Sequence, residues 1–289
     1  MTHGNDMRLD FFTTDENFPF YIQYGNHEQE MFIHGHEDFS ELVIVLGGQA
    51  THIVDNENFT VSKGDVFVMN QGIKHGYDKA ENFKICNIMF RPEHLIGESY
   101  DIKALPGYHA LFLLEPEYNK ENGFKSRLKL DPAAFSEAEN IIKAAIKEFE
   151  SDSPARKTMV RSYFLQLIVL LSRLYGRKVK HKEIEGISNA AAYMETNFAD
   201  DITTAKLVEL SHYSQRHFIR LFSATYSVTP QQYLIDIRIR NAVRLLRTTD
   251  LSITETALRC GFSDSNYFCR IFKKYIGVTP SAYRKSAMT

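Results

Sequence analysis

Residues 261–285 read GFSDSNYFCRIFKKYIGVTPSAYRK, and a second copy of this pattern lies 50 residues earlier in the chain. The earlier copy is SHYSQRHFIRLFSATYSVTPQQYLI, residues 211–235. The identical pairs are Phe218 and Phe268, Arg220 and Arg270, Phe222 and Phe272, Val228 and Val278, Thr229 and Thr279, Pro230 and Pro280, and Tyr233 and Tyr283. A match of this length in constant register predicts that one supersecondary unit occurs twice.

Each copy has the pattern of a helix-turn-helix unit. In the later copy, Ser252 is a suitable N-cap for a short helix, and Gly261 permits a tight turn after it. Ser263 is expected to cap a second helix that ends at Gly277, and Ser214 takes the matching position in the earlier copy. A short helix, a turn and a second helix with an exposed polar face is the arrangement that places a recognition helix in the major groove.

The second helix of each unit is expected to contact DNA bases. An Arg on its outer face can donate two hydrogen bonds to guanine, and an Asn can pair with adenine. Lys and Arg elsewhere touch phosphates, which position the protein without reading sequence. For Arg220 and Arg270, the alternatives to a base contact are a contact with phosphate only or an ion pair within the domain. The residues predicted to contact bases are Arg216, Ile219, Arg220, Ser265, Asn266 and Arg270, and those predicted to contact phosphates are Arg240, Lys273 and Lys274.

A predicted helix of about 17 residues, beginning at Pro230, joins the two units. At a rise of ~1.5 Å per residue it spans ~26 Å. Successive major grooves on one face of DNA lie ~34 Å apart. A rigid spacer of this order predicts that both units bind DNA at once. The alternative, an ordinary helical bundle, leaves the repeat unexplained.

Residues 202–285 resemble the AraC/XylS family of bacterial transcription regulators. The resemblance rests on the run from Gly261 to Lys273 and on the Gly-Val-Thr-Pro-Ser-Ala-Tyr-Arg run that begins at Gly277. Val208 and Thr256 depart from the residues that are usual in the family. The resemblance implies binding to asymmetric double-stranded promoter sites through both recognition helices. It also implies activation of transcription, with RNA polymerase as a partner.

Charge is divided between the two ends of the chain. The 289 residues carry a formal net charge of −2, but residues 187–289 hold 13 basic and 8 acidic side chains. A basic module beside an acidic one fits a DNA-contacting part joined to another domain. The N-terminus lacks the apolar core of a signal peptide, and no apolar run is long enough for a membrane span. Only three Cys occur, without a C-x-x-C pair, so a cytoplasmic protein with no membrane partner is expected.

The rest of the chain predicts an α+β, multi-domain protein. Residues 18–90 contain short β-branched runs separated by turn residues, which indicates a sandwich or barrel. The predicted domains are a cupin-like β-barrel that binds an effector, residues 1–130; a helical dimerisation segment, residues 131–176; a charged linker, residues 177–186; and an all-α DNA-binding domain, residues 187–289.

An apolar stripe in the helical segment suggests a homodimer. Its members recur at helical spacing: Val160, Phe164, Leu167, Leu171 and Leu174. One interpretation is a seam of coiled-coil character between two chains. The other is packing of the stripe against its own domain.

The sheet-rich region contains a cluster of metal-ligand residue types. His34 and His36 are two apart, so on a strand their side chains lie on one face. With Glu41 and His75 they resemble the ligand set of a metal-binding cupin, which would hold a divalent ion. The alternatives are that these side chains and Tyr77 bind a polar effector by hydrogen bonds, or that they are structural. No other cofactor is expected.

The segments DFSELVIVLGG and KGDVFVMNQGIKHGY are similar to those of rhamnose-responsive members of the AraC/XylS family. This similarity implies a sugar as the small-molecule effector. A competing hypothesis is a metal-binding cupin enzyme fused to a DNA-binding domain. Apart from the four metal-ligand residues, no nucleophile–base pair or phosphate-binding loop supports catalysis, so a regulator without enzymatic activity is the preferred interpretation.

Overall fold

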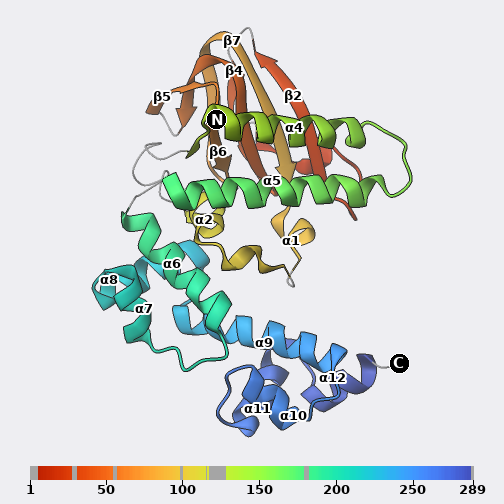
Figure 1. The fold of residues 1–289 in the computed structure, drawn as a ribbon, viewed down its shortest axis with the longest axis vertical. Coiled ribbons are helices and arrows are strands. Elements are labelled where there is room, and N and C mark those ends of the chain that lie inside the picture. Colours follow the sequence, from red (N-terminus) through yellow and green to blue (C-terminus); the bar gives the residue numbers. More distant parts are fainter. Residues whose placement is uncertain are drawn as a thin grey trace, which may run out of the picture. The chain divides into compact units, whose positions relative to one another are not determined.

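Figure 1 shows the computed structural model of the protein, which describes residues 6–27, 31–54, 57–97, 100–114, 116, 128–178 and 182–287. The chain forms two compact units, Met1–Ile184 and Glu185–Thr289. The first unit is rich in β-structure and the second is helical, which confirms the predicted fold class. Within the described ranges, no helix has the length and apolar character needed to cross a membrane.

The boundary between the units falls inside the predicted linker, residues 177–186. Most of that range is helical, because α5 (Arg156–Lys178) extends into it and α6 (Lys182–Asn197) begins within it. The two units therefore divide within the predicted linker, although its described residues are helical. The stretch is rich in Lys and Glu, which are good helix formers, so charge alone did not distinguish linker from helix.

Two long antiparallel strands, β4 and β7, organise the sheet. They pair from Ser40 opposite Phe90 to Val54 opposite His75, and the register shifts between Val45 and Thr51. Along its other edge, β4 pairs with β6 near its start and with β5 near its end. On the other edge of β7, β3 pairs near the start of the strand and β2 near its end. The strands are β1 (Asp6–Met7), β2 (Phe20–His27), β3 (Met31–His36), β4 (Ser40–Val54), β5 (Glu57–Ser62), β6 (Asp65–Met69), β7 (His75–Phe90) and β8 (Leu128–Lys129).

The irregular register has a visible cause at Gly48. Its φ of +66° lies in the left-handed region, and a Cβ there would meet the carbonyl oxygens of Glu81 and Asn82 at 2.2 Å. Glycine therefore lets β4 bend against β7. The apolar residues of the bent strands form one core, which includes Val43, Val54, Val61, Phe67, Tyr77, Phe83 and Ile85.

Two helices lie side by side across the strands, α4 (Pro132–Phe149) and α5 (Figure 1). Asp131 caps α4 by accepting a hydrogen bond from the Ala134 N–H, and Pro132 occupies the first helical position, as predicted. Phe164 of α5 packs edge-on against Phe20 and Phe90, with ring centroids 5.3 and 4.8 Å away. Aromatic contacts therefore attach the helix pair to the sheet.

The apolar stripe of α5 packs against its own domain. Val160, Phe164, Leu167 and Leu171 are at most 1% exposed within a single chain. A side chain already buried in the monomer has no surface left for a partner, so the predicted dimer seam along this stripe was wrong. The other interpretation, that the stripe packs against its own domain, agrees with this burial.

The described residues between Pro92 and Leu114 form short helical elements, in a region for which the sequence predicted no regular structure. Gly107 of α2 packs against α5 so closely that a Cβ would meet the Ser172 carbonyl oxygen at 1.9 Å. These elements are α1 (Pro92–Leu95), η2 (Asp101–Ala104), α2 (Pro106–Tyr108) and η3, a π-helix (His109–Leu114). Another short helix, η1 (Leu9–Phe11), lies near the start of the chain.

The second unit contains both predicted helix-turn-helix units. Side-chain caps at Thr203, Ser214 and Ser252 begin α7, α8 and α10. The predicted cap of α11 at Ser263 was off by one residue, because the Asp264 carboxylate accepts from the Asn266 N–H. Besides α6, the helices are α7 (Thr204–Ser211), α8 (Gln215–Tyr226), α9 (Pro230–Thr248), α10 (Ile253–Arg259), α11 (Ser265–Ile276) and α12 (Pro280–Ala287).

The repeat is reproduced in the packing of the two units. The ring centroids of Phe218 and Phe222 lie 5.6 Å apart, as do those of Phe268 and Phe272. Phe222 meets Tyr233 edge-on at 5.4 Å, and in the later unit the same pair, Phe272 and Tyr283, is 5.8 Å apart. In Figure 1, α9 runs from α8 to the α10–α11 pair, the place predicted for the connecting helix.

Candidate functional site

The sheet-rich unit brings together the four residues that the sequence singled out as ligands. His34 and His36 come from β3, Glu41 from β4 and His75 from β7, and all are at most 3% exposed. The His75 Nε2 atom lies 3.3 Å from His36 Nε2 and 3.4 Å from Glu41 Oε2. His36 Nε2 is 3.6 Å from the same carboxyl oxygen. One donor atom from each of the four lies within 4.8 Å of the others.

A fifth histidine, His52, belongs to the cluster and was missed in the sequence. Its Nε2 atom lies 3.3 Å from His75 Nδ1. Its ring is stacked between those of Phe67 and Tyr77, at 4.7 and 4.9 Å. Tyr77, predicted as an effector ligand, therefore lies behind His52 and is not among the residues that line the adjoining cavity.

A cavity of about 270 Å³ opens beside the cluster. This volume is just below the usual range of small-molecule pockets, roughly 300–1,000 Å³, and suits a compact ligand. Two of the residues that line it, Glu41 and Asn87, each hold a buried side-chain oxygen, Oε2 and Oδ1 respectively, with no hydrogen-bond partner among the described residues. The polar residues that line it are Gln23, Asn26, His34, His36, Glu41 and Asn87, and the aromatic ones are Phe12, Tyr24 and Phe39.

Burial removes formal charge from this site. It raises the pKa of Glu41 to about 8 and, with the neighbouring His34, lowers the pKa of His36 to about 3. The pKa of His75 is lowered by burial and by the surrounding imidazoles. At neutral pH the imidazoles are uncharged, and the Glu41 carboxyl retains its proton unless a cation replaces it. Such groups either form hydrogen bonds to a polar ligand or bind a divalent metal, for which neutral imidazole and carboxylate are suitable donors.

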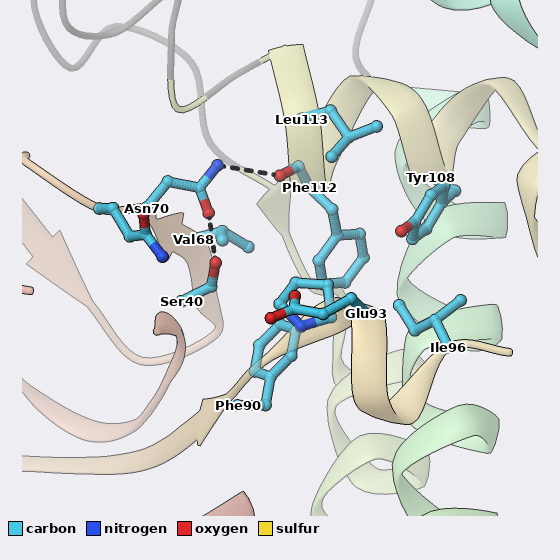
Figure 2. A pocket seen from close by; sticks show the side chains of 11 residues that line it. Ser40, Val68, Asn70, Phe90, Glu93, Ile96, Tyr108, Phe112 and Leu113 are labelled. Atoms are coloured by element: carbon cyan, nitrogen blue, oxygen red, sulfur yellow. Dashed lines mark hydrogen bonds between the residues drawn. The ribbon is translucent and has the colours of Figure 1, made fainter. Parts of the chain in front are cut away.

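A second cavity in the same unit, about 370 Å³ in volume, lies between the sheet and η3 (Figure 2). Figure 2 shows Asn70 in its wall, joined to Ser40 and Phe112. The Ser40 hydroxyl donates to Asn70 Oδ1 at 2.8 Å, and Asn70 Nδ2 donates to the Phe112 carbonyl at 3.2 Å. Because these polar groups already satisfy one another, the cavity beside the histidines is the better candidate for a polar ligand.

The recognition helices α8 and α11 present most of the predicted DNA-contacting residues to solvent. Ile219 and Ser265 are partly buried, whereas the remaining members are exposed: Arg216, Arg220, Asn266, Arg270, Lys273 and Lys274. The apolar faces of the same helices are fully buried through Phe218, Phe222, Phe268 and Phe272. Each of α8 and α11 therefore has one polar face that is exposed to solvent.

The two equivalent arginines are oriented in similar ways. The Arg220 guanidinium approaches His217 Nδ1 at 3.4 Å. The Arg270 guanidinium lies over the ring of Tyr267, 5.9 Å from its centroid. His217 and Tyr267 are themselves 50 residues apart, so each Arg contacts the aromatic side chain three residues before it.

Arg240 is excluded from this DNA-facing set. Its guanidinium forms ion pairs with Glu195 at 3.2 Å and Asp236 at 2.9 Å, and its side chain is only 16% exposed. The Arg240 guanidinium is thus paired with carboxylates of its own domain, which contradicts its predicted contact with a phosphate. A partly buried Arg with two acidic partners holds α9 to α6.

A sheet-rich unit with a cavity partly lined by polar side chains, together with a helical unit that carries two helix-turn-helix motifs, defines a ligand-binding transcription regulator. Residues 17–168 match the model of the AraC-like ligand binding domain family, and residues 207–286 match that of a helix-turn-helix domain. The first match covers more than half of the chain. The protein belongs to the AraC-like family of DNA-binding transcription regulators.

Known proteins of similar sequence cover nearly the whole chain. The HTH-type transcriptional activator RhaR of Mannheimia succiniciproducens is 26% identical over 275 residues, 95% of this chain and 94% of the relative. The HTH-type transcriptional activator RhaS of an Enterobacter species is 27% identical over 260 residues, 89% of each chain. These relatives support the interpretation as a regulator rather than a fused enzyme.

Two solved structures are also similar. The DNA-binding domain of AdpA, determined with a target DNA, is 30% identical and covers 35% of this chain and 92% of its own, with a TM-score of 0.35. ToxT of Vibrio cholerae is 14% identical and covers 92% of this chain and 96% of its own, with a TM-score of 0.34.

Proposed function

We propose that the protein activates transcription at promoter DNA when a compact polar effector, such as a monosaccharide, occupies the cavity beside His34, His36 and Glu41. One observation supports this most strongly: two residues that line the cavity, Glu41 and Asn87, each hold a buried side-chain oxygen with no hydrogen-bond partner among the described residues. Buried polar atoms are rarely left unsatisfied. A ligand rich in hydroxyl groups would satisfy them.

The remaining parts of the proposal follow from the family. The relatives RhaR and RhaS are named transcriptional activators, so RNA polymerase is a proposed partner. The protein acts as a regulator and not as an enzyme. A homodimer, if formed, uses a surface other than the buried stripe of α5. Promoter DNA is contacted by Arg216, Ile219, Arg220, Ser265, Asn266 and Arg270 at bases, and by Lys273 and Lys274 at phosphates.

Replacing Asn87 with Leu should weaken effector binding while leaving DNA binding unchanged. The substitution keeps the size of the side chain and removes its hydrogen-bonding groups, and such a loss costs about 1–3 kcal/mol, or roughly 5- to 150-fold in affinity. A thermal-shift screen of the full chain against a panel of monosaccharides identifies the effector, and calorimetry then compares wild type with Asn87→Leu.

The matched control is Asn58→Leu, which changes the same residue type at an exposed position on β5. It should bind effector as wild type does. Equal effector affinities for wild type and Asn87→Leu would show that the cavity has been assigned wrongly.

A further inference from the structure

The histidine cluster has the spacing of a metal coordination sphere. In a tetrahedral site with ligand bonds of ~2.0–2.2 Å, neighbouring donor atoms are separated by about 3.3–3.6 Å. The three donor pairs among His36, Glu41 and His75 are separated by 3.3, 3.4 and 3.6 Å. His34 completes the group of four.

Two of the imidazoles are also turned in the way that metal ligation requires. His34 Nδ1 lies 3.2 Å from the Phe32 carbonyl oxygen, to which only a protonated Nδ1 can donate, so its Nε2 keeps a lone pair. His75 Nδ1 faces His52 Nε2 at 3.3 Å, with His75 Nε2 directed to the cluster. Histidine ligands almost always donate their other ring N–H to such an acceptor, which fixes the tautomer and the ring plane.

We propose that His34, His36, Glu41 and His75 bind a divalent transition-metal ion, and that His52 orients His75 toward it. His52 suits this positioning role because its ring is clamped between Phe67 and Tyr77. In this arrangement the His75 Nδ1–H donates to His52 Nε2. The uncharged imidazoles and the single carboxylate fit Zn²⁺, Ni²⁺, Fe²⁺ or Mn²⁺.

The ion would also form part of the effector site, so this inference deepens the proposed function. His34, His36 and Glu41 line the 270 Å³ cavity, whereas His75 and His52 lie behind them. An ion held there is reached from the cavity and favours effectors that offer oxygen donors. The ion would be a resident group of the ligand-binding unit and would take part in no reaction.

The test uses the purified full chain, stripped with a chelator, dialysed and titrated with Zn²⁺ and, separately, Ni²⁺ by calorimetry. We expect one ion per chain, confirmed by elemental analysis after gel filtration. The isosteric variant Glu41→Gln and the variant His36→Ala should each lower the affinity by at least tenfold. His94→Ala, which changes an exposed histidine of the same unit, should bind as wild type does.

His52 is tested by His52→Phe, which keeps a ring in the stack and removes the acceptor of the His75 N–H. We expect a loss of about 10–100-fold in metal affinity, the usual effect of removing such a partner. The thermal midpoint of the metal-free protein should be nearly unchanged, and His52→Gln, which keeps an acceptor, should recover part of the affinity. The absorption spectrum of the Co²⁺-loaded protein should change in His52→Phe.

Two results would overturn the proposal. One is the absence of stoichiometric metal binding by wild type, and the other is equal binding by wild type, Glu41→Gln and His36→Ala. If either occurs while the monosaccharide response still depends on Asn87, the effector cavity stands and only the ion is rejected. Unchanged metal affinity in His52→Phe would remove the role of His52.

Discussion

Replacing Arg220 and Arg270 together with Ala should weaken binding to the operator by about 2–6 kcal/mol, because each bidentate contact with guanine is worth roughly 1–3 kcal/mol. Both side chains are exposed on the polar faces of α8 and α11, and each contacts the aromatic side chain three residues earlier. If the two units bind at once, the two single losses should add in the double variant, since well-separated sites behave independently.

The measurement is a titration of the single and double variants against operators selected from random DNA by the wild-type protein, at several salt concentrations. Each single variant should lose its preference at one base pair. Lys273→Ala is the control for a phosphate contact: it should weaken binding to all sequences alike and lower the salt slope by about one. If Arg220→Ala and Arg270→Ala also weaken all sequences alike, both arginines are backbone anchors.

Phe268→Ala should destabilise the later helix-turn-helix unit by about 3–5 kcal/mol, the usual result of truncating a buried Phe. Phe268 is fully buried and contacts both Phe262 and Phe272, with ring centroids 5.1 and 5.6 Å away. The resulting cavity would lie directly beneath α11. DNA binding by that unit should be lost together with its fold.

Hydrogen exchange, followed separately in the two repeats, measures this effect. Protection should fall mainly in α10 and α11, and less in α7 and α8. Tyr275→Ala is the matched control, because it removes an exposed ring from the same helix and should cost little. A global loss of protection in both repeats would mean that the two units fold as one.

Capping residues and the repeat made the second unit largely predictable from sequence. Ser214, Ser252 and Gly277 mark helix ends through local hydrogen bonds and a positive φ, which neighbouring residues alone determine. The clustering of His34, His36, Glu41 and His75 was anticipated from a motif resemblance. The helix ends depend on residues within a few positions of them, whereas His75 lies 34 residues beyond Glu41 and only the motif resemblance joined it to the others.

The features missed depend on contacts between distant residues. His52 and Glu41 are an odd number of positions apart, so simple strand alternation places them on opposite faces. The register shifts in β4 between Val45 and Thr51 bring both to one cluster, and only the pairing with β7 shows them. Similarly, the helical spacing around Leu167 gives an apolar face without revealing whether a second chain or the sheet covers it.

We propose that α9 holds the two helix-turn-helix units at a fixed separation so that both bind one DNA site. As a helix of 19 residues, α9 spans about 28 Å at ~1.5 Å per residue. The most direct test inserts five base pairs between the two contacted segments of the operator, which rotates one segment by about half a turn. We expect the affinity to fall to that for an operator with one segment scrambled. An affinity unaffected by the insertion would contradict it.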